Sequence, residues 1–199
     1  MIRLILIFSI CITCLISNYY VYLSVSYQSS FIELDKKIGE NKFSINKDEL
    51  SNLNFYYPSL ALNSVPILTY LSRYDTNAKN YDEAINKLNV SITKNPYSLY
   101  SHYLLARNYI FKNDYINAEN TLEYIFTLSP QIESSSSLYF FILGENKRLD
   151  KLKSLKSIVV ENENRNIWLF YLSSIEKNIL TKDDKIFHTQ LINIFEKKF

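Results

Sequence analysis

The chain has 199 residues, of which 47% are hydrophobic and 21% are charged, and its formal net charge is +2. This composition supports a packed core, and the small net charge argues against a nucleic-acid partner. With 2 Gly and 4 Pro in the whole chain, a sheet rich in tight turns or a Gly-rich nucleotide loop is excluded. We therefore predict an all-α fold.

The N-terminal segment, residues 1–30, is predicted to be a transmembrane anchor. After Arg3, no charged residue occurs before Glu33, and this apolar interval exceeds the about 20 residues that a helix needs to cross a bilayer. The predicted contact with the membrane runs through residues 4–27. The alternative is a cleaved secretory signal, for which Ser24-Val25-Ser26 is the one passable cleavage site.

The charges that flank this span favour opposite orientations. Arg3 and the amino terminus favour a cytoplasmic N-terminus, whereas Lys36, Lys37 and Lys42 favour the reverse. An N-terminal anchor with a short leading tail usually exports the domain after it. We therefore expect a single-pass protein of a bacterial inner membrane, with its soluble part on the extracytoplasmic side.

Residues 31–60 are predicted to connect the span to the soluble part. The segment FIELDKKI can continue the membrane helix outward as far as Gly39, which is a natural stop. Tyr56-Tyr57-Pro58 then leads into the soluble part in an extended conformation, because a residue before proline avoids the helical region.

A repeat with a period of about 34 residues, a length typical of stacked helix pairs, organises residues 61–130. Four pairs of identical residues share this spacing: Tyr81 and Tyr115, Ala84 and Ala118, Leu88 and Leu122, and Pro96 and Pro130. We predict a first helix that opens near Pro66, followed by helices at about 81–94, 98–112 and 115–128. Asn80 and Asp114 are predicted N-caps.

The second of these two units resembles the tetratricopeptide repeat. The matching residues are Leu105, Ala106, Tyr109, Ala118 and Pro130. His102 stands where that family often has a large aromatic residue, and the first unit departs further, with Ser72 at the small position and Asp75 in place of the tyrosine. The resemblance implies a tetratricopeptide-like α-solenoid of about three to four helix pairs, whose concave face binds a protein or peptide.

After Pro130 the period fades in the sequence, and residues 131–199 are predicted to form degenerate repeats or a C-terminal helical cap. One helix pair is expected to break at Gly144-Glu145-Asn146. A further pair comes after a loop at 161–164. An open stack of helix pairs needs such a region to cover its last apolar face.

Three features occur in order along the chain: the predicted span, a YYPSL stretch and an NPY sequence between repeats. Together they resemble the C-terminal part of some bacterial O-antigen ligases or polymerases. Those proteins carry many spans, whereas this sequence has one predicted span. The resemblance implies an accessory or separated part of a glycan-transfer system, with a multi-span ligase or polymerase subunit as its partner.

The sequence shows no constellation for catalysis. Cys11 and Cys14 lie inside the predicted span, and His102 and His188 lack ligand-like partners at metal spacing. Asp183-Asp184 fits a first-turn charge on a helix better than a catalytic pair. We therefore expect no enzymatic activity, no cofactor and no metal site. Trp168, in an apolar run, is expected in the core rather than on a ligand.

A partner-binding groove is predicted around two arginines. Arg73 and Arg107 stand one repeat period apart, so they occupy equivalent places on successive first helices. Two aligned guanidinium groups can grip a carboxylate, such as a peptide C-terminus or an acidic side chain. Tyr100, Tyr103 and Phe111 are expected to flank Arg107. The alternative is that both arginines are ordinary solvated or salt-bridged residues.

These expectations combine into a membrane-anchored scaffold for protein–protein interaction. We expect it to serve a bacterial envelope complex, linked to surface polysaccharide assembly. The rival hypothesis is the accessory or separated part of an O-antigen ligase or polymerase system. A secreted soluble repeat protein is the third reading.

Overall fold

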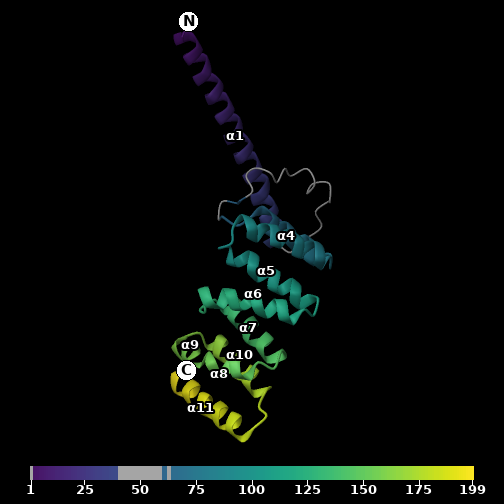
Figure 1. Cartoon of the computed structure of the whole chain (residues 1–199), viewed down its shortest axis with the longest axis vertical. Coiled ribbons are helices and arrows are strands. Elements are labelled where there is room, and N and C mark those ends of the chain that lie inside the picture. The colour runs from purple at the N-terminus through teal and green to yellow at the C-terminus, as the bar shows by residue number, and fades with distance from the viewer. Residues whose placement is uncertain (1, 40–59, 62–63) are drawn as a thin grey trace. The chain divides into compact units, whose positions relative to one another are not determined.

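The computed structural model describes residues 2–39, 60–61 and 64–199 (Figure 1). Within these ranges it contains ten helices, and the β-structure there is a single isolated bridge between Leu60 and Pro66. The all-α prediction is therefore confirmed. The chain divides into two compact units, Met1–Ser98 and Leu99–Phe199, which are called the first and the second unit below.

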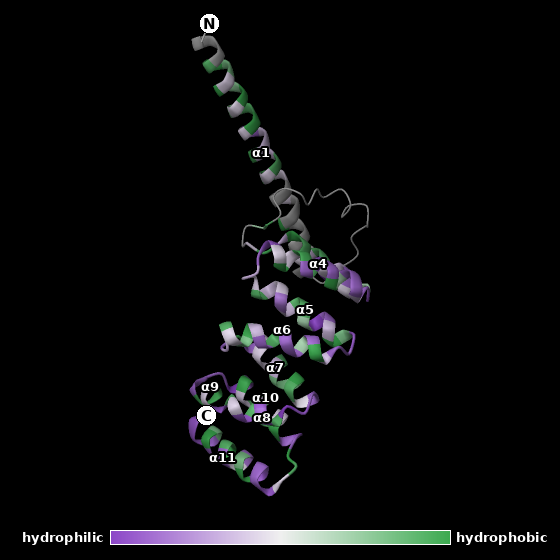
Figure 2. Cartoon of the chain, in the orientation of Figure 1, coloured by the Kyte–Doolittle hydropathy of each residue, from purple (hydrophilic) through white to green (hydrophobic). Residues whose placement is uncertain are grey.

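Helix α1 (Ile2–Gly39) carries the predicted span. Its stretch Leu6–Ser26, 21 residues long, is long and apolar enough to cross a membrane, and none of it is buried. Figure 2 shows hydrophobic residues recurring along this helix. The helix continues through the FIELDKKI segment and ends at Gly39 as predicted. Residues 40–59 of the predicted connector, including Tyr56-Tyr57-Pro58, lie outside the described residues.

Beyond α1, the described residues of the first unit form one helix pair, α3 (Ile67–Asn77) and α4 (Tyr81–Lys94). The predicted bounds 81–94 agree with α4. Its apolar core comes from both helices: Ile67, Tyr70, Leu71, Ala84 and Leu88 are buried. Asn80 occupies the N-cap position of α4, but its side chain makes no capping hydrogen bond. The predicted capping role of the Asn80 side chain is therefore wrong.

The second unit contains seven helices in its described residues. They are α5 (Leu99–Phe111), α6 (Tyr115–Leu128), α7 (Glu133–Glu145), α8 (Leu149–Ser154), α9 (Lys156–Glu161), α10 (Arg165–Glu176) and α11 (Lys182–Lys198). Helix α5 packs on α6, α7 packs against both α6 and α10, and α10 packs on α11. The predicted helices 98–112 and 115–128 are thus confirmed to within a residue.

One continuous core fills the second unit. Its largest fully buried side chains are Trp168, Tyr139, Tyr171 and Phe140. The indole Nε1 of Trp168 donates to the backbone oxygen of Asn162 at 2.9 Å, which satisfies its polar atom inside the core. The predicted core role of Trp168 is confirmed.

The same turn joins the two helices of three successive pairs. In each turn one residue has a left-handed backbone: φ is 63° at Lys79, 60° at Asn113 and 56° at Lys147. The residue after it donates its backbone N–H to the carbonyl oxygen of the residue five positions earlier. The three bonds are Asn80 to Asp75, Asp114 to Tyr109, and Arg148 to Leu143, at 2.8–2.9 Å. This pattern is the Schellman motif, where Gly is the usual residue because a Cβ is strained there.

The period of these turns therefore continues for one more helix pair after Pro130. The left-handed residues Asn113 and Lys147 are separated by one full repeat period, and so are the helix starts Tyr115 and Leu149. After Pro130 the identical side chains no longer recur, as expected. The turn between the two helices does recur, so the expectation is wrong for the turn. A Schellman turn is specified by backbone hydrogen bonds, so it recurs without the repeated Ala or Pro.

The predicted break of this helix pair at Gly144-Glu145-Asn146 is confirmed, because helix α7 ends at Glu145 and Asn146 is its C-cap. Gly144 itself lies inside the last turn of α7 and has a further role in packing. A Cβ at this position would lie 3.3 Å from the Cβ of Ser174 on α10. The missing side chain lets α7 and α10 approach closely. The left-handed residue Lys147 of the Schellman turn follows directly after this break.

The remaining C-terminal predictions are largely confirmed. Residues 162–164 form the predicted loop, and α10 and α11 form the last helix pair. The second helix of the third pair differs from expectation, because it is interrupted at Leu155 into the short helices α8 and α9.

Candidate functional site

Arg107 lies between two aromatic rings on α5, one half-buried and one exposed. Its guanidinium carbon lies 5.8 Å from the ring centroid of Tyr103 and 5.6 Å from that of Phe111. One ring comes from the preceding turn of the helix and the other from the next turn, so the helical repeat places all three side chains on one face. These distances are within the range of cation–π attraction. We call Tyr103, Arg107 and Phe111 the α5 cluster.

The α5 cluster leaves its charge available. Arg107 is exposed and makes no ion pair with any residue that the structure describes, and Phe111 is 44% exposed. Two aromatic rings hold the guanidinium group without neutralising it. Such an arginine can present its planar donors to a carboxylate in a bidentate contact.

The other predicted groove residues have different placements. Tyr100 is half-buried on the same helix, α5. Arg73 is half-buried on α3 and belongs to the first unit, whereas Arg107 belongs to the second. The structure thus brings Tyr103 and Phe111 to Arg107, and the alignment of Arg73 with Arg107 stays a prediction.

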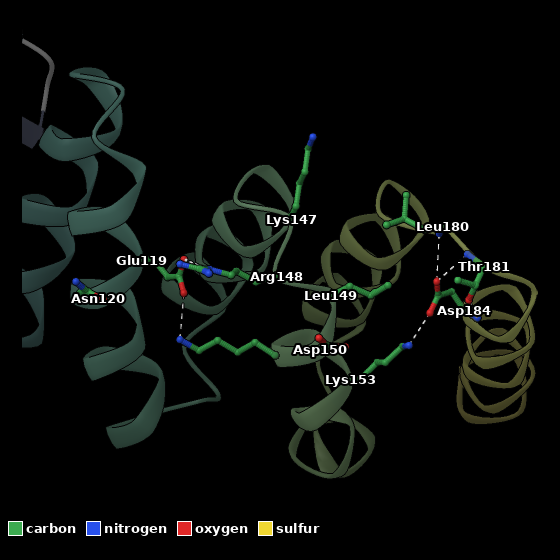
Figure 3. A pocket seen from close by; sticks show the side chains of 11 residues that line it. Glu119, Asn120, Lys147, Arg148, Leu149, Asp150, Lys153, Leu180, Thr181 and Asp184 are labelled. Carbon is green, nitrogen blue, oxygen red and sulfur yellow. Dashed lines mark hydrogen bonds and ion pairs between the residues drawn. The ribbon is translucent and has the colours of Figure 1, made fainter.

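A second candidate is a polar pocket of about 800 Å³ in the second unit (Figure 3). Its walls come from α6, the turn after α7, α8 and the segment that opens α11. Four cationic residues line it, Lys147, Arg148, Lys151 and Lys153, together with the carboxylates Glu119, Asp150 and Asp184. We call it the basic pocket.

Glu119 forms one wall of the basic pocket. It is 5% exposed, and its carboxylate accepts hydrogen bonds from Asn146 at 2.7 Å, Lys151 at 3.1 Å and Arg148 Nε at 3.3 Å. Burial opposes ionisation of Glu119, but these three donors outweigh burial and hold the pKa of the carboxyl below its ordinary value. Glu119 is therefore a buried anion that fixes the position of two cations.

Asp184 plays the corresponding part on the opposite wall. Lys153 donates to its carboxylate at 2.5 Å, and the backbone N–H groups of Thr181 and Leu180 donate at 2.8 and 3.2 Å. The bond from Lys153, followed by that from Thr181, holds the pKa of Asp184 well below its usual range. Asp184 also closes a capping box with Thr181 at the start of α11. The predicted first-turn role is confirmed for Asp184.

Sequence reasoning missed the basic pocket. A usable signal existed, because opposite charges recur at nearly one repeat length in the second unit. The separation in sequence is 32 between Glu119 and Lys151, and 31 between Lys153 and Asp184. In stacked helix pairs, residues about one period apart lie on adjacent layers, so such pairs can bridge successive repeats.

The histidines do not contribute a metal site. In the described part of the chain, no three His, Cys, Asp or Glu side chains gather as metal ligands would. The ring of His102 lies 4.5 Å from that of Tyr124, and His188 is buried on α11. Comparison with family models, curated proteins and solved structures finds no match to this chain.

Proposed function

We propose that this protein is a membrane-anchored helical-repeat scaffold that holds a protein partner in a bacterial envelope complex, without catalysis of its own. The observation that carries the proposal is the α5 cluster. An exposed Arg107, flanked by Tyr103 and Phe111 and lacking an ion pair among the described residues, is suited to recognition. Aromatic and arginine side chains are also the residues that most often dominate binding energy at interfaces.

The chemistry of the α5 cluster favours an acidic peptide. A carboxylate can accept two parallel hydrogen bonds from the Arg107 guanidinium, and the flanking rings can contact the apolar part of the peptide. The occupant is therefore a peptide C-terminus or an acidic side chain next to an apolar one. Arg73 on α3 is the second proposed contact, in the equivalent position of the preceding repeat.

A repeat architecture supports this role. Helix pairs joined by the same Schellman turn recur at one fixed period, as in tetratricopeptide-like solenoids, which present successive first helices to a partner. The apolar stretch Leu6–Ser26 supports attachment to a membrane. We place the repeats on the extracytoplasmic side of the inner membrane, in a complex linked to surface polysaccharide assembly.

Site-specific photocrosslinking in living cells tests the proposal. A photoreactive residue replaces Phe111, in the α5 cluster, or Ile116, which is 66% exposed on α6 and serves as the matched control. We expect a discrete adduct from position 111 and none from position 116. An Arg107→Ala change should abolish that adduct, and its combination with Arg73→Ala should leave helicity by circular dichroism unchanged.

The same experiment discriminates the rival hypothesis. An adduct with a multi-span glycan ligase or polymerase would identify the chain as an accessory subunit of that system. Equal adducts from positions 111 and 116, or an adduct that survives Arg107→Ala, would overturn the assignment of the α5 cluster as the binding surface.

A further inference from the structure

We propose that the basic pocket is a second binding site, which takes the phosphate group of a small polar ligand. It lies on α6, α8 and the start of α11, whereas the α5 cluster lies on α5. The proposal is independent of the scaffold function. It rests on three features of the pocket: unused cationic donors, compensated carboxylates and a rigid support.

The unused donors belong to two neighbouring residues. Arg148 contacts Glu119 through Nε alone, so both terminal nitrogens of its guanidinium lack a hydrogen-bond partner among the described residues. Its side chain is 54% exposed. The Lys147 ammonium makes no hydrogen bond or ion pair with the described part of the chain, and Figure 3 shows this side chain extending away from the ion-paired ones. Guanidinium and ammonium groups that make no other bond are suitable donors to a phosphate.

Two of the three carboxylates that line the pocket are already ion-paired. Glu119 is ion-paired with Arg148 and Lys151, and Lys151 also contacts Glu123 at 2.8 Å. Asp184 is ion-paired with Lys153. The third lining carboxylate, Asp150, is exposed. With Glu123 counted, four carboxylates balance the four cations, so the binding of an anion depends on the donors of Arg148 and Lys147 that make no bond with a described residue and not on a net positive charge.

The guanidinium group of Arg148 and the backbone of Lys147 are held in place before a ligand arrives. The nearly buried Glu119 accepts from Nε of Arg148 at 3.3 Å, which holds the guanidinium group at the wall formed by α6. The Schellman turn fixes the backbone of Lys147 at a φ of 56°, and the N–H of Arg148 donates to Leu143 at 2.9 Å. Donors that are already oriented lose less entropy on binding.

The size and lining of the pocket define the ligand class. A volume of about 800 Å³ accommodates more than one phosphate ion. The lining is mostly charged or polar, and its apolar members are Leu149 and Leu180. A phosphate on a polar body, such as glycerol or a sugar, fits this lining. Both a soluble phosphate ester and a phospholipid headgroup carry that chemistry.

Calorimetry on the full chain tests the site. The protein is placed in nanodiscs of phosphatidylcholine and titrated with glycerol phosphate at constant ionic strength. We expect saturable binding, weakened about tenfold by Arg148→Gln, the loss typical of a charge-assisted hydrogen bond. Lys147→Gln should weaken it several-fold, and because this side chain makes no polar contact with a described residue, folding is not at risk. The matched control is Lys79→Gln, which changes the equivalent turn residue of the first unit.

A parallel titration distinguishes the two sources of phosphate. Dihexanoyl phosphatidylglycerol, used below its micelle concentration, carries the phosphate as a lipid diester. Tighter binding of this lipid than of glycerol phosphate identifies a headgroup site, and the reverse order identifies a site for a soluble ester. The proposal is overturned if neither probe binds saturably, or if Lys79→Gln weakens binding as much as Lys147→Gln does.

Discussion

The left-handed Lys147 provides a quantitative test of how the repeat turns are built. Its φ of 56° is imposed by the Schellman turn between α7 and α8. A residue with a Cβ is strained in this region by about 1–2 kcal/mol relative to the right-handed region. Glycine removes the strain but loses about 0.5–1 kcal/mol more backbone entropy on folding. We therefore expect Lys147→Gly to raise the free energy of unfolding by about 0.5–1 kcal/mol.

Two matched variants isolate the cause. Lys147→Ala removes the same side chain and charge but keeps the strained Cβ, so it should give no gain. Asn113→Gly changes the equivalent turn, where φ is 60°. Since Asn tolerates the left-handed region better than Lys does, this gain should be only a few tenths of a kcal/mol.

Trp168 reports on the second unit, which contains both turns. It is the chain's single Trp and is fully buried, so its fluorescence reports unfolding in denaturant or on heating. For a unit of about 100 residues, 1 kcal/mol corresponds to a Tm shift of roughly 4–8 °C. If Lys147→Gly and Lys147→Ala change stability equally, backbone strain at position 147 does not limit the stability of this turn.

Three further predictions concern the core and the ion pairs of the second unit. Gly144→Val should lower its stability by about 1–3 kcal/mol, because the new side chain meets Ser174, already 3.3 Å from an added Cβ; circular dichroism during thermal unfolding measures this. Trp168→Ala should cost about 3–5 kcal/mol by leaving a cavity, measured by denaturant unfolding. Stability should also fall as the pH drops below the ordinary pKa values of Glu119 and Asp184, 4.5 and 3.8, because the unfolded chain takes up these protons first.

Each of these predictions has an outcome that contradicts it. A neutral Gly144→Val would mean that α7 and α10 are not closely packed there. A loss below about 1 kcal/mol for Trp168→Ala would be inconsistent with full burial. The acid prediction has its own control, since Glu119→Gln should reduce the dependence of stability on pH below 4.5. An unchanged slope would show that Glu119 is not held as a buried anion.

The helix pairs could be predicted from the sequence because the residues that pack them recur at a fixed interval. Ala84 and Ala118 lie where two helices approach closely, and both are fully buried. Asp114 is a capping residue by type, and its carboxylate accepts from the N–H of Asn117 at 3.2 Å. These features are local or repeat at a fixed interval, so one sequence suffices to find them.

The third repeat was hidden because its recurring element is a backbone turn. A lysine such as Lys147 does not indicate a left-handed backbone. One period after Pro130, where a repeated proline would stand, the sequence has Asn164. The break at Gly144-Glu145-Asn146 was predicted, but the packing role of Gly144 was not, since a glycine near a helix end has the same appearance whether or not it admits a neighbouring helix. That role follows from the contact with Ser174.

The candidate sites could be predicted from the sequence only in part. The flanking of Arg107 by Tyr103 and Phe111 is a consequence of helical spacing alone. The basic pocket could not be assembled in the same way, because Glu119, Lys151 and Asp184 come from three different helices. Which charges on separate helices pair with one another can be predicted only when the packing of the helices is known.

Protease accessibility in intact spheroplasts, combined with membrane fractionation, is the most direct test of a repeat domain held at the membrane by α1. We predict that protease added outside removes the repeats, while an N-terminal fragment containing Leu6–Ser26 stays with the membrane. Protection of the repeats would place them in the cytoplasm. Release of the uncut protein from the membrane would contradict the anchor itself.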